Sequence, residues 1–270
     1  MKKISVIVTT KNEEKVLGNL LESIKHQSIR DYEVVLVDNF STDKTLEIAR
    51  KYGVRIFQKG PERSVQRNLG VEKAVGEYVL ILDADMQLTK DVLFDGLEKF
   101  ENETYGALVV PERSVGVGFW AKVKAFERSF YVGDSSIEAA RFFRKDVFQK
   151  FGGYDTSITG PEDYDLPYRM RRKGVKIGRV RSFILHNEGN FSPLKSAKKK
   201  FYYASRARIY LKKHPELLST QGNMLIRPVF IKKWKRLIKY PFLASCMFIL
   251  KGLEMAAAAL GFLYGLLGSR

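Results

Sequence analysis

Two aspartates in the first half of the chain, Asp83 and Asp85, have a spacing that suits metal binding. They follow an apolar run, residues 77–82, whose composition is typical of a buried strand. Two carboxylates two residues apart at a strand end can hold Mg²⁺ or Mn²⁺, which prefer oxygen ligands and keep some water. Gln87 is placed to add a third oxygen. The pattern predicts a divalent cation site, and a solvated turn is the alternative.

A second group of acids comprises Glu162, Asp163 and Asp165, directly after Pro161. Proline suits the first turn of a helix, and the helix dipole favours acids at that end, so the group has a purely structural explanation. A carboxylate here could also accept a proton from a reacting hydroxyl as a general base. The residues alone leave both explanations open.

The elements that must position these acids alternate between strand and helix over the first 110 residues. Such alternation predicts an α/β fold with right-handed crossovers and a mostly parallel sheet flanked by helices. Ligands in these folds bind beyond the carboxyl ends of the strands, where polar clusters occur after three of the runs. No P-loop or dinucleotide motif is present. The expected strands are 4–9, 32–37, 54–57, 77–82 and 107–110, and the expected helices are 16–24, 46–52, 64–75 and 90–100.

The later elements are less regular. We expect helices at 119–131, 161–173 and 193–214, and strands at 139–144 and 184–186. The only clear boundary between domains lies near residues 218–227. It predicts two parts, residues 1–218 and residues 219–270.

Charge and hydropathy set the C-terminal part apart. The chain has 47 Lys and Arg against 30 Asp and Glu, and 14 of these bases fall between Lys195 and Lys239, with Glu216 as the only acid there. Residues 240–268 then hold only Lys251 and Glu254 as charges. We expect a basic interfacial helix at about 227–239 and an apolar segment at 240–268. The latter either spans the membrane once or lies partly in it, and a buried helix of a soluble protein is the alternative.

Several motifs, in order, resemble family 2 glycosyltransferases with the GT-A fold, over the first 190 residues. They are SVIVTTKNE (5–13), VDNFSTD (37–43), RNLG (67–70), DADMQ (83–87), RFFRKDVFQKFGGYD (141–155) and GPEDYDLPYRMRRKG (160–174). The resemblance implies a nucleotide-sugar donor, Mn²⁺ or Mg²⁺ as cofactor, and inversion at the anomeric carbon. The family often has Pro at position 9 and an aromatic residue at 11, so Thr9 and Lys11 depart from it.

The resemblance also assigns roles to residues. Asp163 would be the general base, with Glu162 as the second choice. The nucleotide would contact Thr9, Lys11, Glu13, Asp38, Arg67 and Asp83, and the metal would contact Asp83, Asp85, Gln87 and His186. For His186 a plain structural histidine is the alternative.

These features predict an enzyme that transfers one sugar from a nucleotide-sugar to a hydroxyl of a lipid-linked glycan. They favour GDP-mannose over a UDP-sugar as the donor. The expected location is the cytoplasmic face of the cell membrane, in contact with membrane lipids and without nucleic acid. Absence of a QxxRW motif argues against long-chain synthesis. The form DADMQ also suggests a polyprenyl-phosphate mannosyl or glucosyl synthase, whose phosphate acceptor needs no base. A lipid- or RNA-binding module without activity is the third hypothesis.

Overall fold

The computed structural model describes residues 3–134, 137–215 and 228–267. Contacts divide the chain into two units. The first comprises Met1–Arg113, Ser135–Thr156 and Glu162–Asn187, and the second comprises Ser114–Asp134, Ser157–Pro161 and Glu188–Arg270. The expected boundary near residue 218 lies outside the described residues. Three helices that precede it in the sequence belong to the second unit, together with the C-terminal helices.

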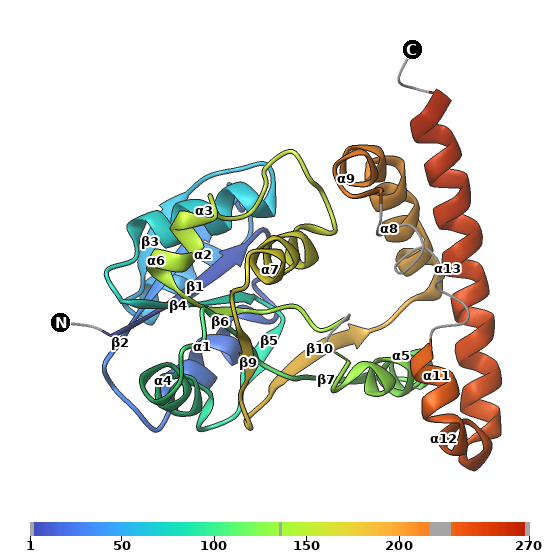
Figure 1. Cartoon of the computed structure of the whole chain (residues 1–270), viewed down its shortest axis with the longest axis horizontal. Helices are drawn as coiled ribbons and strands as arrows, with labels where there is room; N and C mark the ends of the chain where they lie inside the picture. The colour runs from blue at the N-terminus through green and yellow to red at the C-terminus, as the bar shows by residue number, and fades with distance from the viewer. Residues whose placement is uncertain (1–2, 135–136, 216–227, 268–270) are drawn as a thin grey trace. The chain divides into compact units, whose positions relative to one another are not determined.

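The first unit is built on a seven-stranded sheet with the order β3-β2-β1-β4-β8-β6-β9 (Figure 1). Strands β3, β2, β1 and β4 run parallel, β8 runs antiparallel to both its neighbours, and β6 and β9 are parallel. The predicted mostly parallel sheet is therefore confirmed. The strands are β1 (Ile4–Thr10), β2 (Tyr32–Asp38), β3 (Arg55–Gln58), β4 (Tyr78–Asp83), β6 (Ala107–Val109), β8 (Phe142–Arg144) and β9 (Ile177–Arg179).

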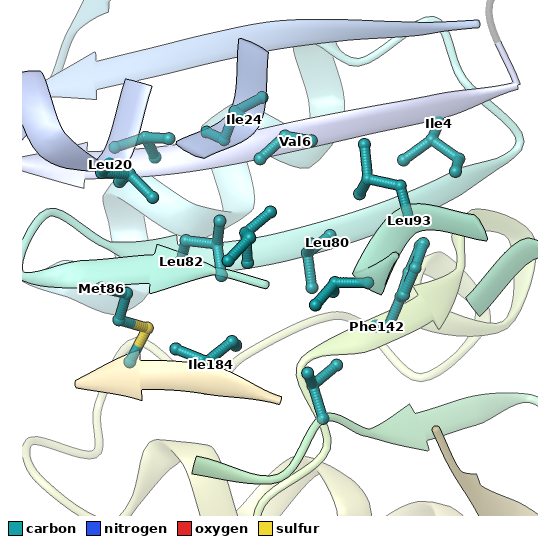
Figure 2. Close-up of a cluster of buried hydrophobic side chains, with 14 of the residues drawn as sticks. Ile4, Val6, Leu20, Ile24, Leu80, Leu82, Met86, Leu93, Phe142 and Ile184 are labelled. Atoms are coloured by element: carbon teal, nitrogen blue, oxygen red, sulfur yellow. The ribbon is translucent and has the colours of Figure 1, made fainter. Parts of the chain in front are cut away.

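Helices cover both faces of this sheet because successive side chains of a strand point to opposite sides. Figure 2 shows Val6 and Leu80 in one core cluster with helix residues such as Leu20. Ile7 joins the other cluster. The helices of this unit are α1 (Leu17–Lys25), α2 (Thr45–Lys51), α3 (Arg63–Lys73), α4 (Val92–Asn102), α6 (Lys145–Lys150) and α7 (Glu162–Arg172). The first core cluster receives α1, α2 and α4, and the second receives α3, α6 and α7.

A smaller sheet has the order β5-β10-β7, with β5 (Met86–Leu88), β10 (Ile184–Asn190) and β7 (Glu112–Val117). Strand β10 runs antiparallel to β5, with His186 opposite Met86 and Leu185 opposite Gln87. The pairing brings the expected strand 184–186 beside the residues that follow β4. The sequence analysis did not anticipate β7, whose residues are mostly exposed and lack an apolar run.

The second unit is helical. It contains α5 (Phe119–Tyr131), α8 (Pro193–Ser205), α9 (Ala207–Lys213), α11 (Pro228–Lys232), α12 (Trp234–Lys239) and α13 (Pro241–Leu267). The helix expected at 193–214 is divided at Arg206, and the basic helix expected at 227–239 is divided at Lys233. The apolar segment is one helix that continues through Gly252 and packs against α5 and α8. By length and composition, α13 is the one helix in the described residues that could cross a membrane.

The core can be tested at Gly96, where α4 approaches the sheet. A Cβ at Gly96 would lie 2.1 Å from Cε1 of Phe142, a fully buried ring, whereas a Cβ at Gly18 of α1 would meet nothing within 4 Å. We expect Gly96→Ala to lower the free energy of unfolding by about 1–3 kcal/mol through overpacking. Gly18→Ala, the matched control, should be neutral or stabilising by up to about 1 kcal/mol. Urea unfolding of both variants measures the difference, and equal midpoints would contradict this packing.

Candidate active site

The guanidinium of Arg67 joins three acids in the first unit. Nη2 donates to Oδ1 of Asp83 at 2.7 Å, and Nη1 donates to Oδ1 of Asp163 at 2.7 Å and to Oε1 of Glu162 at 3.4 Å. The side chain of Arg67 has no exposed area. Its planar fork of donors is suited to holding two carboxylates at once. An acid from the end of β4 and two from the first turn of α7 are thereby held together.

The electrostatics keep Arg67 and Asp83 charged. Burial lowers the pKa of Arg67, but attraction to Asp163 and Asp83 outweighs it and raises the pKa well above its ordinary value. Burial likewise raises the pKa of Asp83, but the charges of Arg67, Arg141 and Arg63 outweigh it and hold the pKa well below its ordinary value. Asp83 is therefore ionised throughout the neutral range.

Of the acids at the start of α7, Asp163 has the most accessible side chain. Its side chain is 16% exposed, against 2% for Glu162, which also pairs with Arg63 at 3.1 Å. Asp165 is buried and pairs with Arg169 one turn along the helix at 2.7 Å. Arg67 occupies Oδ1 of Asp163, so Oδ2 is the oxygen of this group best placed to receive a proton.

Beyond Asp83 the charged contacts continue to His186. Arg141 places Nη2 3.7 Å from Oδ2 of Asp83 and donates from Nε to Oε1 of Glu112 at 2.6 Å. The other oxygen of Glu112 accepts from Nδ1 of His186 at 3.0 Å, and Nε2 of His186 lies 3.3 Å from Oδ2 of Asp85. The sequence motifs gave no role to Arg141 or Glu112. Arg141 opens the motif at 141–155 and lies within an expected strand, where an arginine needs an acid partner, whereas Glu112 belongs to no motif.

The pair Asp85 and His186 fits a divalent cation. A neutral His186 that donates from Nδ1 to Glu112 directs a lone pair at Asp85, so a proton or a cation must lie between them. Oδ1 of Asp85 is also buried without a hydrogen-bond partner among the described residues. The described residues hold no group of three or more His, Cys, Asp or Glu arranged for a metal. Two protein ligands completed by phosphate oxygens and water are common for Mg²⁺.

Gln87 lies in the middle of β5, two residues after Asp85. Side chains of directly opposed residues in an antiparallel pair share a face, and successive residues alternate. His186 therefore shares a face with Met86, and Gln87 shares the other face with Leu185. The role of Gln87 as a third oxygen ligand stays a prediction.

The predicted nucleotide residues gather at the carboxyl ends of β1 and β2. Thr10 lies opposite Asp38 and donates to its Oδ1 at 2.8 Å, and the backbone N–H of Ser41 donates to Oδ2 at 2.7 Å. Asp38 thus orders the loop after β2. Thr9 is the register partner of Asp83, so this edge adjoins the acids described above. Lys11 is exposed, and the backbone N–H of Glu13 donates to Oγ1 of Thr45 at 2.7 Å.

Known proteins are similar to this chain in sequence and in fold. A 126-residue segment is 35% identical to the poly(ribitol-phosphate) beta-N-acetylglucosaminyltransferase TarS of Staphylococcus aureus, covering 43% of this chain and 22% of that protein. The PGL/p-HBAD biosynthesis glycosyltransferase of Mycobacterium bovis is 28% identical over 247 residues, 87% of this chain and 91% of that protein. The chain thus spans about a fifth of the first relative and nearly all of the second.

Structural similarity extends over nearly the whole chain. The mannosyltransferase PcManGT from Pyrobaculum calidifontis, solved with GDP-Man and Mn²⁺, matches with a TM-score of 0.66 at 16% identity, covering 97% of this chain and 87% of that one. That similarity shows a GT-A-like fold. Residues 5–157 match the model of the family Glycosyl transferase family 2. The match covers more than half of the chain, and we conclude that this protein belongs to glycosyl transferase family 2.

Proposed function

We propose that this enzyme transfers a single sugar, with inversion, from a nucleotide-sugar to a hydroxyl of a lipid-linked acceptor at the cytoplasmic face of the cell membrane. The observation that carries the proposal is the bridge that Arg67 makes between Asp83 and Asp163. The bridge holds Asp83, which lies beside the proposed nucleotide-binding edge of the sheet, at a set distance from Asp163, the carboxylate that can act as a base. A donor site and a proton acceptor at a set separation are what a displacement at the anomeric carbon requires.

The donor side must stabilise the charge of the leaving nucleoside diphosphate. A divalent cation held by Asp85 and His186 would neutralise part of that charge. Nη1 of Arg141 is buried with no hydrogen-bond partner among the described residues, so it is a free donor for a phosphate oxygen. Thr9, Lys11, Glu13 and Asp38 would position the base and ribose at the ends of β1 and β2.

The acceptor side must remove a proton. The acceptor oxygen attacks the anomeric carbon as the bond from that carbon to the diphosphate breaks, and the hydroxyl proton passes to Oδ2 of Asp163. Attack opposite to the leaving group inverts the configuration. Arg67 holds Oδ1 of Asp163, which restricts rotation of the carboxylate and keeps Oδ2 directed away from the guanidinium.

Two features support a lipid-linked acceptor and a GDP-sugar donor. The helix α13 is long and apolar enough to attach the enzyme to a membrane, where such an acceptor resides. The DADMQ motif favours mannose as the sugar. The alternative is a polyprenyl-phosphate mannosyl or glucosyl synthase, whose phosphate acceptor is already ionised and needs no base.

Asp163→Asn separates these two functions. The amide keeps the size of the side chain and can still accept from Arg67, but it cannot take a proton. We expect transfer to a hydroxyl acceptor to fall at least a hundredfold, within the range of general-base effects, with binding of nucleotide and Mn²⁺ unchanged. Initial rates and nucleotide titration measure this. Glu162→Gln is the matched variant and should retain more activity. Normal transfer by Asp163→Asn to a polyprenyl phosphate would support the synthase instead.

The cation site is tested through Asp85 and through Glu112, which orients His186. Asp85→Ala should lower kcat/KM at least a hundredfold. Glu112→Gln should raise the Mn²⁺ concentration for half-maximal rate by about 10–100-fold, with kcat recovered at saturating Mn²⁺. The control is Glu101→Gln, which removes an exposed partner of Lys3. An unchanged Mn²⁺ dependence in Glu112→Gln would exclude His186 as a ligand positioned by Glu112.

A further inference from the structure

The helix α13 has its charged residues on the protein side and its apolar residues outside. Lys251 and Glu254, its only charges, are each 4% exposed. A surface helix in water has the opposite arrangement, with apolar residues towards the core. The exposed large side chains of α13 are Phe242, Phe248, Ile249, Leu253, Leu260, Leu263, Tyr264, Leu266 and Leu267. This outer face is larger than a soluble surface ordinarily leaves uncovered.

A buried ion network fixes this orientation. Nζ of Lys251 donates to Oε1 of Glu127 at 2.9 Å and to the hydroxyl of Tyr131 at 3.1 Å. Oε1 of Glu254 accepts from Nζ of Lys124 at 3.1 Å, and Lys124 also binds Glu127 at 2.8 Å. Each of the two helices, α5 and α13, therefore contributes one lysine and one glutamate to the network. Turning α13 about its axis would leave buried charges unpaired, which is strongly unfavourable.

The helix α8 covers the same side of α13 further along. A Cβ on Gly261 would lie 2.3 Å from the carbonyl oxygen of Phe201, and one on Gly265 would lie 2.2 Å from that of Ser205. The two helices are thus in backbone contact. Three lysines of α8 are exposed, namely Lys195, Lys198 and Lys199. If α13 crossed a bilayer in this packing, α8 would carry these charges into the hydrocarbon, where charged side chains are costly.

We propose that α13 lies in the plane of an anionic membrane surface, with its apolar face among the lipid chains, and does not span the bilayer. This inference rests on the membrane attachment in the proposed function and specifies its geometry. The lipid is identified by the composition of α11 and α12 next to α13. These helices expose Lys232, Lys235, Arg236 and Lys239 beside Ile231, Trp234 and Ile238, and Tyr240 follows. Basic residues mixed with Trp and Tyr suit anionic headgroups and the membrane interface.

Two positions on α13 distinguish the orientations. Ile249 and Leu260 are 65% and 62% exposed, and 11 residues bring the helix back to nearly the same face. We place a fluorophore on Ile249→Cys or Leu260→Cys in the full chain, with Cys246→Ser as background. In phosphatidylcholine vesicles containing phosphatidylglycerol, quenchers confined to the outer leaflet should report equal, shallow depths for the two labels. A spanning helix would separate the two depths by roughly 15 Å, and that result would overturn the inference.

Flotation with the same vesicles tests the surface itself. Ile249→Glu with Leu260→Glu should reduce vesicle binding at least tenfold, and removal of phosphatidylglycerol should weaken binding of the wild type. The control is Phe94→Glu, at an exposed apolar residue of α4 in the first unit, which should bind normally. Failure of the wild type to bind any vesicle would remove membrane attachment from the proposed function. If the protein bound vesicles but the two labels were buried in a dimer that forms without lipid, this face would be assigned to a second copy of the chain. That result would also overturn the inference.

Discussion

The contact between one buried arginine and three acids governs the arrangement of the first unit. Asp83, Glu162 and Asp163 come from the end of β4 and the start of α7, and their mutual repulsion would separate them without Arg67. Arg67 in turn has no access to water, so it depends on those acids. Removal of one partner from such a group leaves an unpaired buried charge, which is far less favourable than the intact group. The position of α7 relative to the sheet is therefore tied to the same contacts that hold Asp163, the proposed base.

Buried ion pairs also determine the packing of the second unit. Lys124, Glu127, Lys251 and Glu254 pair inside the helical packing and determine which side of α13 faces outward. Burial raises the pKa of Glu127, but Lys124 and Lys251 outweigh it and hold the pKa well below its ordinary value. Glu127 is therefore ionised throughout the neutral range. In each unit, buried charge pairs fix the orientation of the surface to which we assign the substrate or the membrane.

Sequence patterns predicted those elements whose periodicity is strong. The buried strands at 32–37 and 77–82 and the helix at 119–131 agree with the structure to within a residue or so, because continuous apolar runs and helical spacing leave few alternatives. Strand β7 was missed because its pairing, rather than its composition, defines it. The contacts of Glu112 and Arg141 depend on a sheet formed from distant segments. Placement of Gln87 depends on the β5-β10 register, which no local pattern reveals.

We infer that the forked geometry of Arg67, and not only its charge, aligns Asp83 with the proposed base Asp163. Arg67→Lys keeps the positive charge but cannot bind Asp83 and Asp163 through two directed nitrogens. The direct measurement is kcat/KM for sugar transfer by this variant, with thermal unfolding recorded in parallel. We expect Arg67→Lys to fold and to have a kcat/KM at least a hundredfold below that of the wild type. A folded Arg67→Lys variant with wild-type kcat/KM would contradict it.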